Sequence, residues 1–143
     1  MSETTNDVNI RNVCRYIFML NAKIDHLAEF KTELGTLSRE QLYIVEMISE
    51  EPGLTQKTII GRLNKEQTSV SRAVQTLVDQ GYIAKRRNEN DMRASHLEMT
   101  DAGSEALAEL EPSICELSEN VVEELNDEEK RTLMDTLRKI QVQ

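Results

Sequence analysis

Aromatic residues are scarce in this chain of 143 residues. They make up 3% of the sequence and tryptophan is absent, so a hydrophobic core has to be built from Leu, Ile, Val, Met and Ala. An aliphatic composition with few aromatic residues favours helices over sheets. Because 38% of the residues are hydrophobic and 30% are charged, the chain is typical of a globular protein with a highly charged surface.

Long apolar segments are missing as well. No run approaches the roughly 18 residues that a membrane-spanning helix requires. Residues 1–7 are polar and acidic, which distinguishes them from a secretory signal. We therefore expect a cytoplasmic protein that has no membrane partner.

Cysteine and histidine occur only twice each. Cys14 and Cys115 are far apart and fit no metal-binding spacing, so two free thiols are expected in a reducing compartment. His26 and His96 are equally isolated, which predicts no metal and no cofactor. The sequence also lacks a nucleophile–base pair, a Gly-rich phosphate loop and a carboxylate pair on a plausible scaffold, and this argues against an enzyme.

Basic charge is in deficit overall, with a net charge of −9, but it is unevenly spread. Residues 55–97 contain eight basic and four acidic side chains, a net charge of +4, which leaves −13 for the rest of the chain. A basic centre between acidic flanks predicts one surface for DNA and two flanking segments that avoid it.

The first apolar pattern lies within residues 8–34. Its apolar side chains recur at alternating steps of three and four, a spacing typical of a helix that packs along a coiled-coil seam. We expect one long helix that ends at Gly35. Because a short chain has few segments to cover this helix, we expect it to pack partly against a second subunit. The apolar seam consists of Ile10, Val13, Ile17, Leu20, Ile24 and Leu27.

Three further helices are predicted next. Ser38 and Gln41 have the spacing of a capping box, Thr55 is a favourable N-cap, and Gly81 is typical of a helix C-terminus. The apolar residues with helical spacing are Leu42, Val45 and Ile48 in the first of these helices, Ile59, Ile60 and Leu63 in the second, and Val70, Ala73, Val74, Leu77 and Val78 in the third.

The hydrophobic period then changes from helical to two. Residues 82–87 and 95–100 alternate with that period, and the polar residues 88–94 between them complete a predicted β-hairpin. Two helices follow: one begins at Thr100 or Asp101 and contains Pro112, which should kink it, and the other begins after Asn126. Their apolar faces consist of Ala106, Leu110, Ile114, Leu117 and Val121 in the first and Leu133, Leu137 and Ile140 in the second.

A short helix, a tight turn, a second helix and a hairpin follow one another in a winged helix-turn-helix. The sequence therefore predicts a mostly α fold with a small β-hairpin wing. We expect residues 37–100 to form the winged helix-turn-helix DNA-binding domain. Residues 1–36 and 101–143 would form a helical dimerisation region.

The second helix of such a motif enters the major groove of double-stranded DNA. Its outer face should carry hydroxyls, amides and one guanidinium, whereas a merely solvated helix face normally includes Asp and Glu. Arg pairs with guanine and Gln with adenine. The predicted DNA contacts are Gln67, Thr68, Ser69, Ser71, Arg72 and Gln75 on this helix, together with Gln56, Lys57 and Lys65.

The hairpin should provide a second DNA contact. Arg93 lies at its tip, where an arginine can enter the minor groove, and Asp91 is placed to orient Arg93 through a charge-assisted hydrogen bond. Lys85, Arg86 and Arg87 would approach the phosphates from the strand. Taken alone, a charged hairpin is more often ordinary surface.

Together these segments resemble the MarR family of bacterial regulators over nearly the whole chain. The resemblance implies a homodimer on a pseudo-palindromic operator, usually a repressor, which is often relieved by a small phenolic or aromatic effector or by oxidation. The most specific motif is the wing sequence that leads into the next helix. The matching segments are Leu54-Thr55-Gln56, Ser69-Val70-Ser71-Arg72, Leu77-Val78-Asp79-Gln80-Gly81-Tyr82-Ile83, Asp91-x-Arg93-Ala94 and Leu97-x-Met99-Thr100-Asp101-x-Gly103.

Two places depart from the family's pattern. Lys65 and Glu66 replace an apolar residue and a good N-cap, so we expect the turn to be less buried. Met92 replaces a second arginine of the wing, which leaves the minor-groove contact to Arg93.

The resemblance also implies an effector pocket where the dimerisation helices meet the winged domain. Cys14 lies near the start of the first helix, as a reactive cysteine does in peroxide-sensing members of the family. The tyrosines beside that thiol correspond here to Ala28 and Arg39, which leaves Arg11 and Arg15 to activate it, and an inert helix cysteine is the favoured interpretation. The candidate pocket residues are Arg15, Tyr16, Met19 and His26.

The main alternative is a winged-helix module that binds another protein, such as an anti-repressor. This function would fit the net charge of −9 but would leave the basic centre of the chain without a role. The two hypotheses differ in a simple measurement, because binding to nonspecific DNA falls steeply with salt.

Overall fold

The computed structural model describes residues 10–88 and 91–140, with the backbone alone at residues 88 and 91–94. In these residues a mostly α fold carries a small hairpin wing, as predicted. None of the described helices is long and apolar enough to span a bilayer. The elements in chain order are η1 (Ile10–Asn12), α2 (Val13–Leu27), β1 (Phe30–Thr32), β2 (Gly35–Leu37), α3 (Arg39–Glu50), α4 (Gln56–Leu63), α5 (Gln67–Gln80), β3 (Ile83–Asn88), β4 (Asp91–Met99), α6 (Asp101–Val121) and α7 (Asp127–Ile140).

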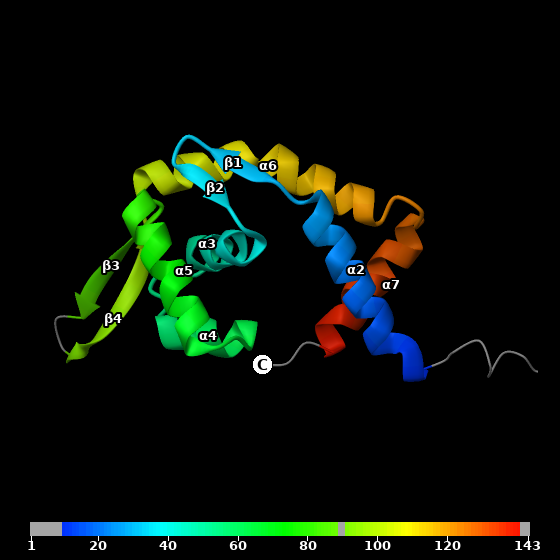
Figure 1. Ribbon diagram of the computed structural model, residues 1–143, viewed down its shortest axis with the longest axis horizontal. Coiled ribbons are helices and arrows are strands. Elements are labelled where there is room, and N and C mark those ends of the chain that lie inside the picture. Colours follow the sequence, from blue (N-terminus) through cyan, green and yellow to red (C-terminus); the bar gives the residue numbers. More distant parts are fainter. Residues whose placement is uncertain (1–9, 89–90, 141–143) are drawn as a thin grey trace, which may run out of the picture.

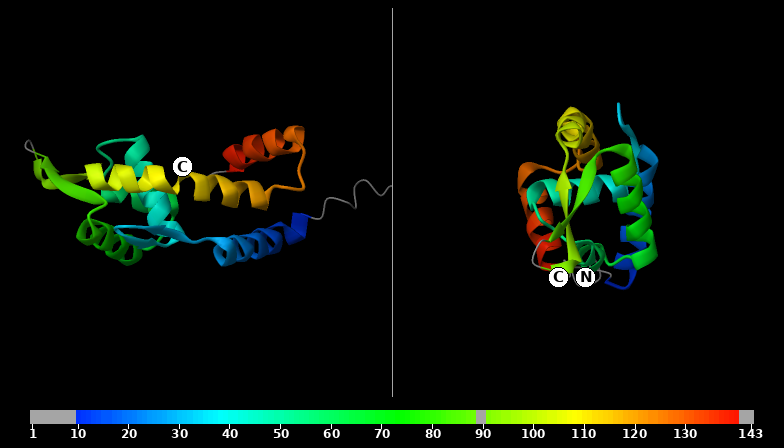
Figure 2. Two further views of the ribbon diagram at one scale, coloured as in Figure 1. Left: turned by 90° about the horizontal axis from the view of Figure 1, so that it is seen from above. Right: turned by 90° about the vertical axis from the view of Figure 1, so that its left-hand side faces the viewer.

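Helix α6 crosses the whole molecule (Figure 1). Helices α3, α4 and α5 and the β3–β4 hairpin gather near its beginning, whereas α2 and α7 lie along its second half. Seen from above, α2 and α7 lie on either side of α6 (Figure 2). The winged region and the two outer helices are thus joined through one continuous helix, which Pro112 does not end.

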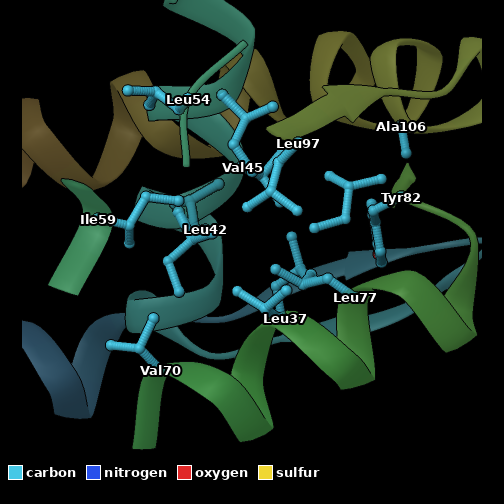
Figure 3. Packing of buried hydrophobic residues seen from close by; sticks show 14 of the residues in the cluster. Leu37, Leu42, Val45, Leu54, Ile59, Val70, Leu77, Tyr82, Leu97 and Ala106 are labelled. Atoms are coloured by element: carbon cyan, nitrogen blue, oxygen red, sulfur yellow. The ribbon is translucent and has the colours of Figure 1, made fainter. Parts of the chain in front are cut away.

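The core lies in the winged region, where α3, α4, α5 and β4 converge (Figure 3). The apolar positions expected to face inward do so: Val45, Ile59, Val70 and Leu77 are completely buried. Removing one such side chain from water contributes about 1.5–3 kcal/mol. The helical spacing of apolar residues is therefore confirmed in all three helices.

The predicted helix ends are also confirmed. The Ser38 hydroxyl accepts from the Gln41 amide at 3.1 Å, and the Ser38 amide donates to the Gln41 side chain at 2.9 Å. Thr55 caps α4 by accepting from Thr58, and Gly81 ends α5 in the left-handed conformation with φ 91°. The side chains of Ser38, Gln41 and Thr55 each satisfy a backbone N–H group that has no partner within the helix.

The prediction of one helix through residue 34 is wrong at its C-terminal end. Helix α2 ends at Leu27, and the next residues form an antiparallel pair of short strands, β1 and β2, with Phe30 opposite Leu37. The reason is that the apolar seam stops at Leu27, while Phe30 and Leu37 are both buried in the winged core. Phe30 therefore packs with the winged region, although it lies within residues 1–36, which were expected to belong to the dimerisation region.

The wing is longer than the sequence indicated. Strand β3 extends to Asn88 and β4 begins at Asp91, so the expected turn of residues 88–94 is shorter than predicted. The Leu97 amide of β4 donates to the Leu54 carbonyl at 2.8 Å, just before α4. This bond joins the wing to the helix-turn-helix.

Tyr82, between α5 and β3, is the junction of the winged region. Its hydroxyl donates to the Gly35 carbonyl at 2.8 Å, and its carbonyl accepts from the Thr100 amide at 3.1 Å. The Thr100 hydroxyl donates to the Gly81 carbonyl at 2.5 Å and accepts from the Gly103 amide at 2.9 Å. A Cβ at residue 103 would lie 2.0 Å from the Tyr82 carbonyl oxygen, so only glycine permits this approach.

We expect Gly103→Ala to lower the free energy of unfolding by about 3 kcal/mol, because the new methyl must displace backbone of a buried junction. Gly61→Ala is the matched control: the added Cβ meets nothing within 4 Å and lies inside α4. It should raise stability by about 0.5–1 kcal/mol. Denaturant unfolding of both variants measures the difference, and equal stabilities would contradict the close packing at Tyr82.

Candidate nucleic-acid interface

Helix α5 presents a polar strip to solvent. Val70, Val74 and Leu77 are buried on one side, and Thr68, Arg72 and Gln75 are exposed on the opposite side. Gln67 is exposed at the first residue of the helix. The strip has the length and chemistry expected of a major-groove helix.

The acid-free stretch of this strip ends at Asp79. This residue lies one turn beyond Gln75, is exposed, and accepts a hydrogen bond from the Gln75 amide nitrogen at 2.9 Å. The bond holds the Gln75 side chain along the helix axis. Asp79 therefore belongs to the candidate interface, although it was not among the DNA contacts predicted from the sequence.

Ser69 and Ser71 are partly buried and hydrogen-bonded within the protein. Ser69 donates to the Glu40 carboxylate of α3, with oxygen–oxygen distances of 3.1 and 3.4 Å. Ser71 accepts from the side-chain amide of Gln56 in α4 at 2.6 Å. The structure thus pairs two predicted contact residues with each other, Gln56 and Ser71, and pairs Ser69 with Glu40. Sequence reasoning missed Glu40 because nothing in the pattern relates residues 29 positions apart.

An open groove of about 460 Å³ lies between the start of α3 and helix α5. Hydroxyl and amide groups surround Arg72 there, and Glu66 at the N-cap of α5 makes no side-chain capping bond. The poor N-cap expected from the sequence is therefore present. The residues that line the groove are Ser38, Gln41, Glu66, Thr68, Ser69, Arg72, Ala73 and Thr76.

The predicted phosphate contacts whose side chains are described are all exposed. Lys57 and Lys65 project from α4 and from the turn that follows it, and Lys85, Arg86 and Arg87 project from β3. The side chains of Asp91 and Arg93 lie outside the described part of the structure. Their backbone belongs to the first residues of β4. Their roles remain predictions.

Arg86 is paired with an acid of the neighbouring strand. Its Nε donates to Glu98 at 2.9 Å, and His96 lies 3.2 Å from the other oxygen of the same carboxylate. The hydrogen bond from Arg86, and then that from His96, lowers the pKa of Glu98. The carboxylate stays charged at neutral pH and offsets part of the positive charge on this strand.

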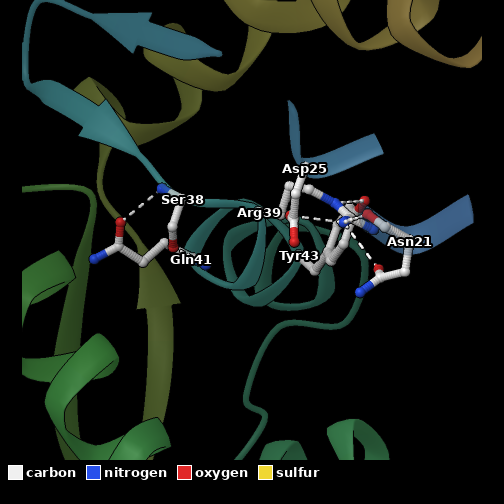
Figure 4. Close-up of polar contacts among 6 residues, drawn as sticks. All are labelled: Asn21, Asp25, Ser38, Arg39, Gln41 and Tyr43. Carbon is white, nitrogen blue, oxygen red and sulfur yellow. Dashed lines mark hydrogen bonds and ion pairs between the residues drawn. The ribbon is translucent and has the colours of Figure 1, made fainter. Parts of the chain in front are cut away.

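Arg39 joins the winged region to α2 (Figure 4). Its Nη1 donates to Asp25 at 2.7 Å and to the Asn21 side chain at 2.9 Å, and its Nε donates to the Tyr43 hydroxyl at 3.2 Å. The Arg39 side chain is only 17% exposed. A cavity of about 350 Å³ lies between α2 and α3 beside these groups.

The residues expected to line an effector pocket lie elsewhere on α2. A second cavity near this helix, of about 390 Å³, is apolar and is lined by Leu20 and Ile24 together with residues of α6 and α7. Neither cavity is lined by the predicted pocket residues Arg15, Tyr16, Met19 and His26. All four are exposed, and Cys14 is exposed as well.

Cys115 on α6 is less suited to redox chemistry. Its Sγ donates to the Glu111 carboxylate at 3.5 Å. This hydrogen bond, desolvation and the charges of Glu111 and Glu119 raise the pKa of the Cys115 thiol. A raised pKa disfavours the thiolate that reacts with oxidants.

Comparison with known proteins agrees with this geometry. The model of the MarR family matches residues 36–94, which include α3, α4, α5 and the wing up to the tip. Over these residues the chain matches the MarR family. The proteins it resembles are transcription regulators and not enzymes, and the sequence resemblance to the MarR family is confirmed over this segment.

Individual relatives extend the comparison beyond the segment that the family model matches. It is 29% identical to the HTH-type transcriptional regulator BilQ of Clostridium symbiosum over 99 residues, which cover 69% of each protein. It is 37% identical to the HTH-type transcriptional regulator PetP of Rhodobacter capsulatus over 60 residues, 42% of this chain but only 36% of PetP. The structure of a mutant MarR from E. coli with operator DNA shares the fold, with a TM-score of 0.77, 21% identity, and coverage of 94% of this chain and 100% of that one.

We expect Glu98→Gln to tighten binding to random-sequence DNA by about threefold at low salt, because Arg86 then faces the phosphates without a competing carboxylate. Glu29→Gln is the control, because it removes the same charge from an acid outside the wing that pairs with Lys31. This variant should leave DNA binding nearly unchanged. Fluorescence anisotropy with labelled duplex measures both. Equal effects of the two variants would show that only net charge matters at this strand.

Proposed function

We propose that this MarR-family chain is a sequence-specific DNA-binding repressor that acts as a homodimer on a pseudo-palindromic operator. The observation that carries the proposal is the exposed polar strip of α5, centred on Arg72 and bordered by exposed basic residues of β3. Among the described residues, no acid pairs with Arg72. A guanidinium in this position suits the bidentate contact to guanine O6 and N7.

The homodimer is supported by the apolar side chains that α2 and α7 leave in water. Ile17 is 55% exposed and Leu137 is 49% exposed, in a chain whose winged core is otherwise fully packed. Exposed apolar side chains gathered on neighbouring elements mark an interaction surface. The exposed apolar side chains on η1 and these two helices are Ile10, Val13, Tyr16, Ile17, Phe18, Met19, Leu20, Leu27, Leu133, Met134, Leu137 and Ile140.

A two-fold axis through α2 and α7 would place two copies of α5 on one face of the assembly. Dimeric helix-turn-helix proteins contact two half-sites about one helical turn of DNA apart, so the operator mirrors the symmetry of the protein. The connection through α6 would fix the separation of the two α5 helices. Occlusion of a promoter by such a dimer is the simplest means of repression.

Relief of repression by a small phenolic or aromatic effector is part of this proposal. The cavity between α2 and α3 is the better candidate site, because it lies at the junction of the winged region with the outer helices and contains the Tyr43 ring beside Arg39. A ligand there would alter the contact of Arg39 with Asp25 and so the position of α3. Oxidation of the exposed Cys14 is the alternative trigger.

Arg72→Ala tests the contact to DNA bases. We expect it to weaken binding to the best operator by about 1–3 kcal/mol and to relax the preference at one position. Lys31→Ala removes a positive charge remote from α5 and serves as the control. Titrations on operator and random duplexes at several salt concentrations provide the measurement; an equal loss on both duplexes would make Arg72 a phosphate contact. A wild-type protein without salt-dependent DNA binding would favour the protein-binding alternative.

Ile17→Glu tests the homodimer. Because Ile17 is largely exposed within one chain, the variant should keep its helicity but dissociate, since association would bury an unpaired charge. Ala22→Glu adds the same charge to an exposed position away from the apolar seam and should remain dimeric. Sedimentation velocity at micromolar concentration distinguishes the two states, and a wild-type monomer with intact helices would disprove the proposed assembly.

A further inference from the structure

The two serines on either side of Val70 take part in hydrogen bonds of opposite polarity. Ser69 donates its only hydroxyl proton to Glu40, at 3.1 and 3.4 Å from the two carboxylate oxygens. Ser71 instead accepts a hydrogen bond from the side-chain amide of Gln56 at 2.6 Å, and within residues 10–88 and 91–140 it donates to no protein group. A serine hydroxyl has one proton and two lone pairs, so these partners decide what each serine still offers to DNA.

Ser69 is left with lone pairs only. Phosphate oxygens, O6 and N7 of guanine and O4 of thymine are all acceptors, and none of them can bond to a group that only accepts. The donors in the major groove are the amino groups at N6 of adenine and N4 of cytosine. The Glu40 carboxylate beside the serine also repels phosphate.

Ser69 is well placed for a base contact. It is the third residue of α5, and the N-terminal residues of a recognition helix are the ones that contact base edges. It also lines the open groove beside Arg72 and is only partly buried. The Glu40 side chain comes from the first turn of α3, whose capping box fixes the start of that helix.

We propose that Glu40 is a specificity-determining residue: it holds Ser69 as an acceptor, so that the pair selects a base with an exocyclic amino group, adenine or cytosine, at one operator position. Glu40 thereby also excludes a phosphate from the start of α5. The inference rests on the proposed function, since it requires that α5 enters the major groove. Ser71, whose proton is available, would favour an acceptor on the DNA.

The experiment begins with selection of an operator from a random duplex pool by the wild-type protein, followed by titration of single-position variants. Wild type should prefer adenine or cytosine by at least about fivefold at one position in each half-site. Replacing that base by purine or pyrimidin-2-one, which lack only the amino group, should cause the same loss. Ser69→Ala and Glu40→Ala should abolish the preference.

Glu40→Gln gives the sharpest result. Its amide can donate to Ser69, which frees the hydroxyl proton, so the preference at this position should shift toward guanine or thymine. Glu50→Gln removes the same charge from the exposed end of α3 and should leave the preference unchanged. A purely structural contact between α3 and α5 would not invert a base preference.

Two outcomes separate the failure of this inference from the failure of the proposed function. If Ser69→Ala and Glu40→Gln retain every base preference of the selected operator, the Glu40–Ser69 bond serves only to hold the helices together and the inference is overturned. If the wild-type protein selects no operator, α5 does not recognise a DNA sequence, and both the proposed function and this inference fail.

Discussion

The close approach of α6 to the carbonyl of Tyr82 is the contact on which the other parts depend. At this point the end of the recognition helix, the first strand of the wing and the first turn of α6 share one set of hydrogen bonds through Gly81, Tyr82 and Thr100. Gly103 has no Cβ, which allows the backbones to meet. Because α6 then extends to α2 and α7, the same contact fixes α5, the helix proposed to contact DNA, relative to the surface proposed for dimerisation. The Thr-x-x-Gly motif that marks the family in sequence thus has a physical reason here.

The candidate interface contains acidic residues, in a protein whose net charge is −9. Glu40, Asp79 and Glu98 each hydrogen-bond to a polar side chain of the candidate interface: Ser69, Gln75 and Arg86 respectively. Each acid reduces the general attraction to phosphate and restricts the orientation of its partner. Both effects lower affinity for random DNA more than affinity for a matching site, because only the matching site uses the fixed orientation.

Most of the fold could be predicted from the sequence, because helices α3 to α7 have regular apolar spacing and conspicuous end signals. The β1–β2 pair could not, since three-residue strands are too short to show a period, and Phe30 and Leu37 join the core through tertiary packing. For the candidate site, the sequence indicated which residues of α5 are polar but not which are exposed. Ser69 is partly buried and bonds to Glu40 from 29 residues away, whereas Gln75 is exposed and bonds to Asp79 of the next turn.

The first turn of α3 is shared between two contacts that face different neighbours. Arg39 bonds to Asp25 and Asn21 of α2, and the adjacent Glu40 bonds to Ser69 of α5. The capping box at Ser38 and Gln41 holds this turn in one conformation. A shift of α2 relative to the winged region therefore acts on α3 at the same turn that orients Ser69. The Arg39 side chain is 17% exposed but its partner Asp25 is 61% exposed, so water still screens this ion pair and the several bonds of Arg39 fix geometry more than they add stability. The helix that would carry the dimer contact and the helix that would contact bases are thus linked through two consecutive residues.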